Sequence, residues 1–371
     1  MSGPPPGDPL GLHGVACVAH VHSTHSDGTA TVAEIVAAAR DAGAACVLLT
    51  DHDSLAARRC GEERWWDDVL LLVGHEVSPK AGHLLVFGLD EEIPHAGRSE
   101  REICTAARDA GGVTFAAHPF SEGSRMSKVI APPHGWTLLD DAVCGGIELW
   151  SLISDSAEAW RTPWEAAAFL RDPMRALTGP PARHVQAWDR LCLRRRVPAI
   201  GGLDAHQHGL RIGGRVRSPM PHARYFSLLQ THVLLPASPS GELAADRAAV
   251  YEALSEGRCY LSFEALAGGD GFRFWADGDG GAAPMGARVD PGRWTLRALT
   301  PRRARLRLLR DGAPLREVEA DRLEHAVEAA GCYRVEARLT GDARGRLWLT
   351  SNPIYVRGRT SSEAGTRRVC H

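Results

Sequence analysis

The stretch VACVAHVHSTHSDG, residues 15–28, carries the pattern on which the predicted fold depends. An apolar run ends in His20 and His22, and Asp27 follows in a turn that contains a glycine. Because side chains alternate between the two faces of a β-strand, a strand here would place both imidazoles on one face. Two histidines in this position can share one cation, so the segment predicts a strand that leads into a metal site.

Other histidines and carboxylates stand beside short apolar runs in the same way. They occur in VLLTDHDS (47–54), LLLVGHEVS (70–78), AGHLLVFGL (81–89), VTFAAHPF (113–120) and AIGGLDAHQHG (199–209). The nine candidate ligands are His20, His22, Asp27, His52, Glu76, His83, His118, Asp204 and His206. Imidazole nitrogen and carboxylate oxygen suit divalent zinc, manganese or iron, and no thiolate joins the set. This donor set favours hydrolysis over redox chemistry.

The order of apolar and helical segments predicts an α/β fold. Apolar runs near residues 15–19, 44–49, 69–73, 84–87, 113–117, 145–149 and 197–203 alternate with helical stretches. Such alternation is typical of βα units around a parallel sheet. Capping boxes at Thr31–Glu34 and Ser99–Glu102 mark the starts of two helices. We expect a repeating βα barrel with the ligands at the carboxyl ends of its strands, where active sites lie.

The motif blocks resemble the polymerase and histidinol phosphatase (PHP) superfamily of metal-dependent hydrolases. The blocks HVHSTHSDG, TDHD, GHE, AHPF and LDAH have that family's residue types in its order, over residues 15–265. The segments at 222–237, 251–263 and 351–356 are similar to its carbaryl-hydrolase-like (CehA/McbA-type) branch.

The resemblance implies a distorted (β/α)7 PHP barrel that holds up to three metal ions, with Glu76, Asp204 and His206 central to catalysis. His20, His22, Glu76 and Asp204 would hold one ion. Glu76 would bridge to a second ion held by His83 and His118. Asp27, His52 and His206 would complete a third site. The residues themselves define only the ligand set, and this partition comes from the family.

Two or three divalent ions (Zn, Mn or Fe) lower the pKa of a shared water from about 15.7 toward about 7, which makes hydroxide available near neutrality. The expected activity is hydrolysis of the phosphoester bond of a small molecule or short nucleotide by a metal-bridged hydroxide. A carboxylic ester or carbamate hydrolase of the same fold is an alternative. A catalytically idle, metal-bound scaffold or binding protein is an alternative of another class.

Neighbours of the motifs are candidates for supporting roles. Asp51, Glu148 and His25 are expected to orient the ligating side chains. A general acid is not identified among these three and His208. Candidate substrate contacts are Arg125, Lys128, Arg211 and Arg215, for which a role on the solvated surface is the alternative. His134 falls among the histidines expected on the surface.

Composition divides the chain further. Residues 1–14 are expected to be a flexible leader and residues 15–268 the barrel, with a helical insertion at 151–196. Short alternating strands at 270–358 predict an accessory β-sandwich, and residues 359–371 a disordered tail. In the insertion, Trp160, Trp164, Phe169 and Trp188 are expected to pack between helices.

Charge and cysteine content narrow the function classes. The 371 residues hold 43 basic and 45 acidic side chains, a net charge of −2, which favours neither long nucleic acid nor an anionic membrane as partner. Nine cysteines without a C-x-x-C pair suggest free thiols in a reducing cytosol. We found no secretory signal and no run of about 18 apolar residues, so a cytoplasmic location is expected. Oligomeric state stays open.

Overall fold

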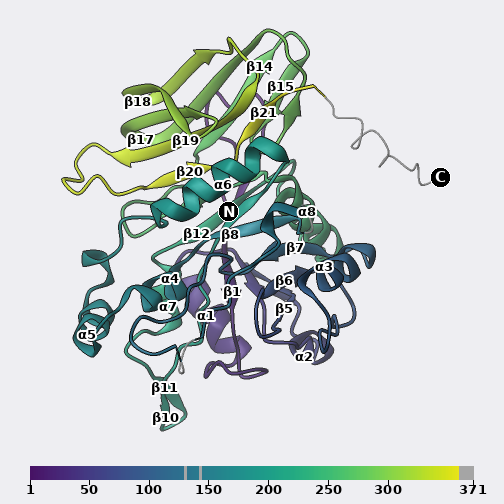
Figure 1. Ribbon diagram of the computed structural model, residues 1–371, viewed down its shortest axis with the longest axis vertical. Coiled ribbons are helices and arrows are strands. Elements are labelled where there is room, and N and C mark those ends of the chain that lie inside the picture. Colours follow the sequence, from purple (N-terminus) through teal and green to yellow (C-terminus); the bar gives the residue numbers. More distant parts are fainter. Residues whose placement is uncertain (129–131, 142–143, 359–371) are drawn as a thin grey trace.

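The computed structural model describes residues 1–128, 132–141 and 144–358, so the tail predicted at 359–371 lies outside the described residues. The fold is mixed α/β (Figure 1). All seven apolar runs form strands. They are β1 (His13–Val21), β2 (Cys46–Leu49), β4 (Val69–Val73), β6 (Leu84–Phe87), β7 (Val113–Ala116), β8 (Gly146–Ser151) and β9 (Ala199–Gly202).

These strands lie in two sheets whose ends are joined. The strands β1, β2 and β4 are parallel to one another, as are β7, β8 and β9. Hydrogen bonds from Leu203 N–H to Ala19 O (2.9 Å) and from Glu76 N–H to Asp51 O (3.2 Å) connect the second sheet to β1 and to the segment that follows β2. The candidate ligands are therefore drawn to one end of both sheets.

Among the seven predicted strands, one departs from the expected parallel sheet. The strand β6 runs antiparallel to both β5 (His75–Val77) and β7. His83 accordingly precedes its strand, whereas the sequence analysis placed every ligand at a carboxyl end. Because β6 is reversed, its amino end lies beside the carboxyl ends of its neighbours, and His83 still reaches the same edge.

Helices cover the strands. They are α1 (Val32–Asp41), α2 (Ala56–Arg59), α3 (Glu100–Asp109), α4 (Leu152–Ala159), α5 (Pro163–Arg171), α6 (Ala182–Arg194), α7 (His222–Phe226) and α8 (Leu243–Glu256). Both predicted capping boxes are present, at the starts of α1 and α3. Within the described ranges, no helix is long and apolar enough to cross a lipid bilayer.

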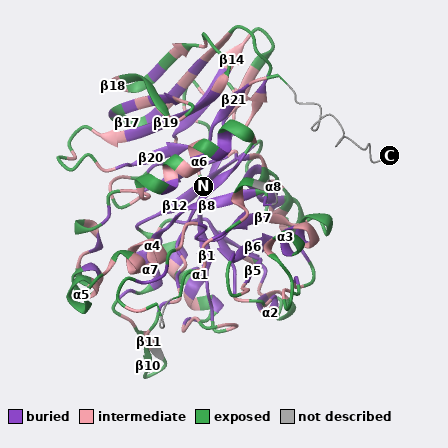
Figure 2. Ribbon diagram, in the orientation of Figure 1, coloured by how far each residue is buried: buried purple, intermediate pink, exposed green. Residues whose placement is uncertain are grey.

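The helical insertion is only partly packed as predicted. Phe169 and Trp188 are buried, but Trp160 is half-buried and Trp164 is 83% exposed. Trp164 belongs to α5, which lies at the margin of the molecule and has exposed residues, drawn green in Figure 2. The prediction that these aromatic residues pack between helices is therefore confirmed for Phe169 and Trp188 and wrong for Trp164.

The C-terminal strands are β14 (Arg273–Gly278), β15 (Gly281–Pro284), β16 (Arg288–Val289), β17 (Trp294–Arg310), β18 (Ala313–Ala326), β19 (Gly331–Leu339), β20 (Leu349–Ser351) and β21 (Ile354–Val356). They enclose a second hydrophobic core that includes Leu306, Tyr333 and Trp348. The strand β20 pairs with β13 (Cys259–Ser262), which pairs with β12 (Gln230–Leu235) and through it with β1. Both groups of strands therefore share one hydrogen-bonded sheet.

The first residues are tied to this second group, in contrast to the flexible leader expected at 1–14. Ser2 and Gly14 form a two-way backbone bridge with N–O distances of 3.0 and 2.9 Å. The carboxylate of Asp8 pairs at 2.8 Å with the guanidinium of Arg273, and both side chains are buried. A buried pair of opposite charges holds this segment in place, which composition alone does not reveal.

Candidate metal centre

Side chains from distant parts of the chain meet at one edge of the two sheets. All nine candidate ligands fall into three groups whose donor atoms lie within 4.8 Å of one another. The groups are His20, His22, Glu76 and Asp204; Glu76, His83 and His118; and His22, Asp27, His52 and His206. Their membership matches the partition that the family resemblance implies, with His22 placed to serve two groups.

Glu76 stands at the centre of the cluster, fully buried. Its Oε1 lies 2.9 Å from Nδ1 of His83 and 3.1 Å from Nε2 of His118. Its Oε2 lies 3.2 Å from Nε2 of His20 and 3.1 Å from Nδ1 of His52. The two oxygens of one carboxylate thus face different groups of imidazoles, which is the arrangement that a bridging ligand requires.

Two further carboxylates complete the cluster. Asp204 Oδ1 lies 3.4 Å from Nε2 of both His20 and His22. Asp27 Oδ1 lies 3.2 Å from Nε2 of His206, and Asp27 Oδ2 lies 3.7 Å from Nε2 of His52. Asp27 is the outermost carboxylate, about half-exposed at 52%.

The donor atoms fit divalent cations. Nε2 of His20, both nitrogens of His22 and Oε2 of Glu76 are buried and lack a hydrogen-bond partner. The carboxylate oxygens nearby are close enough but do not provide hydrogen-bond geometry. Each such buried polar atom costs about 1–3 kcal/mol when it is left unsatisfied. Imidazole nitrogens and carboxylate oxygens that converge in this way are the donors that a divalent metal ion uses.

The pKa values of two carboxylates and of His22 suit ligation, whereas at His20, His118 and His206 burial lowers the pKa but neighbouring carboxylates prevail and raise it. Burial favours the neutral form of Glu76, but His20 and His83 outweigh it and hold the pKa of Glu76 well below its usual value. Burial also raises the pKa of Asp204, but the charge of His20 outweighs burial and holds this pKa well below its usual value. Burial, reinforced by the His206 imidazole, lowers the pKa of His22 to about 3. Ionised carboxylates therefore stand beside a neutral imidazole.

The backbone is strained at three ligands. The φ angles of His20, His118 and Asp204 are 60°, 27° and 52°, in the left-handed region that residues other than glycine rarely adopt. The register of β1 against β2 shifts between Ala19 and Val21. His20 and His22 therefore converge through a bulge and not through the simple two-residue alternation predicted for the strand. Strain of this kind persists where surrounding contacts impose it, often at functional sites.

The carboxylate of Glu148 contacts two candidate ligands, His20 and His118. Its Oε1 lies 2.9 Å from Nδ1 of His20, and its Oε2 accepts a 2.7 Å hydrogen bond from the backbone N–H of His118. When Nδ1 of His20 donates to this carboxylate, Nε2 is left with its lone pair facing Glu76 and Asp204. The sequence analysis proposed this orienting role for Glu148.

Asp51 and His25 differ in their positions. Asp51 accepts hydrogen bonds from the backbone and the hydroxyl of Ser23, both 2.7 Å, and from Ser26 Oγ at 2.6 Å. It thereby shapes the loop between His22 and Asp27. His25 instead directs Nε2 to Glu62 at 2.7 Å, and among the described residues no hydrogen bond or ion pair joins its ring to a candidate ligand. Of the two, Asp51 is placed to support the cluster.

Three neighbours of the cluster escaped the sequence analysis or were misread by it. His134, expected on the surface, lies with its ring 4.3 Å from that of His83, and its Nδ1 is buried without a hydrogen-bond partner. The hydroxyl of Ser154 donates to Oδ2 of Asp204, and Ser78 Oγ lies 2.7 Å from Nδ1 of His52. His134 follows no strand, so only its tertiary position reveals it.

The four candidate substrate contacts lie in different surroundings. Arg211 pairs with Glu34 at 2.9 Å and donates to the backbone oxygen of Thr29, so its guanidinium is already engaged. Lys128 is exposed, and Arg125 lines a cavity beside α4. Arg215 belongs to the β11 strand (Arg215–Arg217), which pairs with β10 (Leu210–Ile212), but its side chain lies outside the described part.

No family model and no curated protein matches the sequence. Among solved structures, the chain is similar to a two-domain protein from Bacteroides vulgatus that contains a predicted PHP-like metal-dependent phosphoesterase. The identity is 16%, the TM-score is 0.47, and the match covers 92% of this chain and 95% of that one. For PsfC from Pseudomonas syringae, the identity is 15%, the TM-score is 0.40, and the coverage is 63% and 87%.

A third similar structure is a protein from Bifidobacterium adolescentis assigned provisionally as a metal-dependent phosphoesterase. Here the identity is 17%, the TM-score is 0.34, and the coverage is 57% of this chain and 94% of that one. PHP-like proteins are thus found among the similar structures, and none of these three points to the carbaryl-hydrolase-like branch. All three TM-scores are below 0.5.

Proposed function

We propose that this chain is a metal-dependent phosphoesterase of the PHP type whose centre holds two or three divalent cations. One observation carries the proposal. Nine imidazole and carboxylate ligands converge on one edge of the sheets, and several of their donor atoms are buried without a hydrogen-bond partner. A cluster that served stability alone would leave these atoms paired.

The proposal includes a finer description of the fold. Residues 15–268 would form the distorted (β/α)7 barrel and residues 270–358 the accessory β-sandwich. The backbone hydrogen bonds that join both ends of the second sheet to β1 and to the segment after β2 support a closed ring. The second core within the C-terminal strands supports a separate layer there.

In this proposal His20, His22, Glu76 and Asp204 hold one ion, Glu76 shares a second with His83 and His118, and Asp27, His52, His22 and His206 serve a third. Ions bound there would supply a hydrolytic hydroxide near neutral pH and polarise the substrate oxygen. Asp204 and His206 stand with Glu76 as the residues closest to the reacting group.

The chain's own residues prepare this centre. Glu148 fixes the ring of His20 and the backbone of His118, so neither ligand needs to reorganise during turnover. Only three of the nine ligands are carboxylates, and imidazoles ligate as neutral groups. The ligands therefore bring less negative charge than two or three divalent ions bring positive charge. This balance favours an anionic substrate group such as a phosphoryl over a neutral ester.

A small-molecule phosphoester or a short nucleotide is the proposed substrate, in a cytoplasmic setting. The described cysteines are all free, which supports a reducing compartment. No partner protein is needed to complete the ligand set.

The test is metal analysis combined with a substrate panel. We expect two or three equivalents of transition metal in the purified protein. Chelation should abolish hydrolysis of an activated phosphoester, and readdition of manganese, zinc or iron should restore it. The variant Glu76→Ala should lose both metal and turnover, whereas Glu264→Gln, which changes a Glu–His pair outside the cluster, should keep both.

Other outcomes decide between the alternatives. Higher kcat/KM values for aryl esters or carbamates than for phosphoesters would show that the protein is an ester or carbamate hydrolase and not a phosphoesterase. Bound metal without turnover of any substrate in the panel would favour the scaffold. Full activity of Glu76→Ala would contradict the bridging role.

A further inference from the structure

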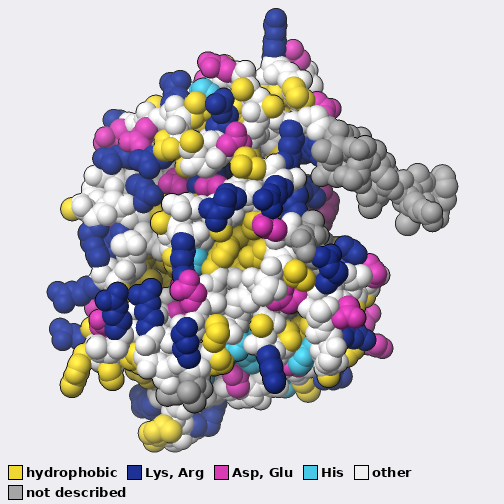
Figure 3. Space-filling view, in the orientation of Figure 1, with side chains coloured by type: hydrophobic (Ala, Val, Ile, Leu, Met, Phe, Trp, Pro, Cys, Tyr) yellow, Lys and Arg dark blue, Asp and Glu magenta, His cyan; other side chains and the backbone are white. Residues whose placement is uncertain are grey.

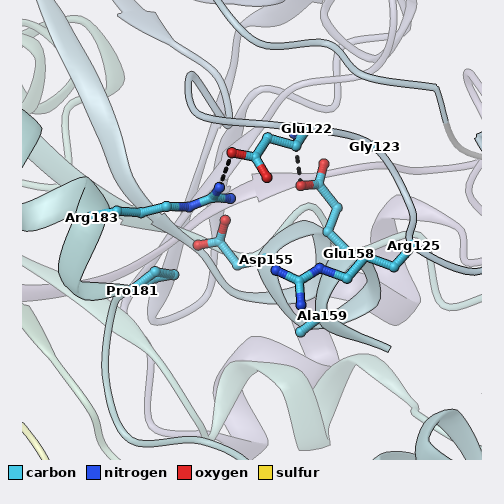
Figure 4. A pocket seen from close by; sticks show the side chains of 8 residues that line it. All are labelled: Glu122, Gly123, Arg125, Asp155, Glu158, Ala159, Pro181 and Arg183. Carbon is cyan, nitrogen blue, oxygen red and sulfur yellow. Dashed lines mark hydrogen bonds and ion pairs between the residues drawn. The ribbon is translucent and has the colours of Figure 1, made fainter. Parts of the chain in front are cut away.

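Two adjoining cavities lie beside α4, the helix whose Ser154 contacts the candidate ligand Asp204. The smaller, about 180 Å³, is lined by residues of the loop after His118 and by Asp155, Glu158 and Ala159 of α4 (Figure 4). The larger, about 630 Å³, lies between α4 and α5. Arg125 and Ala159 line both. A volume of this size is ordinary for a small-molecule site.

The two ends of α4 face different sites, because its first turn contacts the metal centre and its last residue lines the larger cavity. Ser154, in the first turn of α4, donates its hydroxyl to the candidate ligand Asp204. Ala159, which ends α4, lines the cavity five residues later. At about 1.5 Å of rise per residue, Ala159 lies roughly 8 Å from Ser154 along the helix axis. A substrate with its phosphoryl group at the cluster can span this distance.

The lining combines an aromatic wall with unpaired positive charge. Four guanidinium groups line the cavity, from Arg125, Arg161, Arg171 and Arg175, against the carboxylates of Glu165 and Asp172. Among the described residues, no carboxylate pairs with Arg125, Arg161 or Arg171, while Arg175 lies 3.7 Å from Asp172. Lys and Arg side chains gather on this side of the molecule, over α5 (Figure 3).

The apolar part of the wall is a pair of rings. Trp160 and Phe169 pack with centroids 5.4 Å apart and their planes tilted by 55°. Phe169 is buried beneath, and the half-buried Trp160 presents surface to the cavity. Aromatic rings accept a flat ligand, and guanidinium groups bind carboxylate or phosphate through paired N–H donors.

We propose that this cavity, the α4–α5 cavity, binds the far end of the substrate, and that this end is an aromatic or heteroaromatic group bearing a second anionic substituent. The inference rests on the proposed phosphoesterase function and narrows its substrate class. The metal centre receives the phosphoryl group, the rings receive the flat body, and the arginines receive the distal anion.

The kinetic test uses two substrates that differ only in the distal anion, 2-naphthyl phosphate and 6-carboxy-2-naphthyl phosphate. With metal-loaded protein, kcat/KM should be at least tenfold higher for the carboxylated ester. The double variant Arg161→Ala/Arg171→Ala should remove this preference and leave 2-naphthyl phosphate within twofold of wild type. Arg190→Ala, an exposed arginine of α6 that lines neither cavity, is the matched control.

A binding test separates this inference from the proposed function, because it needs neither metal nor turnover. Metal-free protein should bind 6-hydroxy-2-naphthoate, followed by its fluorescence anisotropy, at least tenfold more tightly than 2-naphthol. The double variant should lose this difference, and Arg190→Ala should keep it.

If no phosphoester is turned over but the naphthoate binds as described, the proposed function fails and the anion site stands. Equal binding of naphthoate and naphthol, or equal binding to wild type and double variant, would overturn the α4–α5 site. Selective binding without any kinetic preference would overturn its link to the substrate.

Discussion

Replacing Glu148 by glutamine tests how the centre is held together. This buried carboxylate uses one oxygen for Nδ1 of His20 (2.9 Å) and the other for the backbone N–H of His118 (2.7 Å). Both partners are donors when His20 presents Nε2 to a metal. Glutamine keeps the shape but offers one acceptor and one donor, so one of the two contacts becomes donor against donor.

The expected loss follows from that single mismatch. A buried donor without an acceptor costs about 1–3 kcal/mol. Removing the carboxylate behind a ligating histidine typically lowers metal affinity or activity by about 10–100-fold. At about 1.4 kcal/mol for each factor of ten, the two ranges overlap. We therefore expect metal affinity and kcat/KM of Glu148→Gln to fall by about 10–100-fold.

Metal affinity is measured by competition with a fluorescent chelator, and kcat/KM with an activated phosphoester. The control is Glu264→Gln, which alters a similar pair, His232 Nε2 to Glu264 Oε1 at 2.8 Å. His232 pairs with Ala16 in β1, four residues before His20, which puts it about 13 Å away along the strand. If Glu148→Gln binds metal and turns over substrate within twofold of wild type, the orienting role is refuted.

Three further predictions concern other contacts. Gly202→Ala would put a Cβ 1.9 Å from Oε1 of Glu148, so metal affinity should fall at least tenfold, while Gly268→Ala, with ordinary contacts, should not change it. Asp8→Ala leaves the buried guanidinium of Arg273 unpaired, so urea unfolding should show a loss of about 3–5 kcal/mol; a loss below about 1 kcal/mol would contradict the pair's role. Burial opposes ionisation of Glu336, but Arg334 and Arg338 prevail and lower its pKa below 4.5. Its ionised form therefore stabilises the fold above that pH, and the stability advantage of wild type over Glu336→Gln should shrink as the pH falls below 4.5; an advantage independent of pH would contradict this assignment.

Local sequence pattern was sufficient for the strands and for the set of histidines and carboxylates that the structure brings together. Each apolar run that precedes or follows a candidate ligand became a strand, because buried strands in α/β folds need continuous apolar residues. The capping boxes at Thr31 and Ser99 were readable because a cap involves residues only three positions apart. The histidines and carboxylates could be named for the same reason, since each sits beside its own strand.

Other features depend on contacts between residues far apart in sequence. The reversed direction of β6, the left-handed backbone at His20 and the placement of His134 against His83 have no local signature. The buried Asp8–Arg273 pair joins residues separated by most of the chain, and composition suggested a free leader there instead.

By itself, the sequence determined which imidazole and carboxylate side chains are candidate metal ligands and which runs form the strands that carry them, because both properties are set within a few residues. Only the tertiary structure decided that Glu76 stands at the centre with one oxygen for each group of imidazoles, and that Glu148 supports His20 and His118 from behind. Those positions depend on strand directions, registers and bulges, which arise only when distant segments pack together.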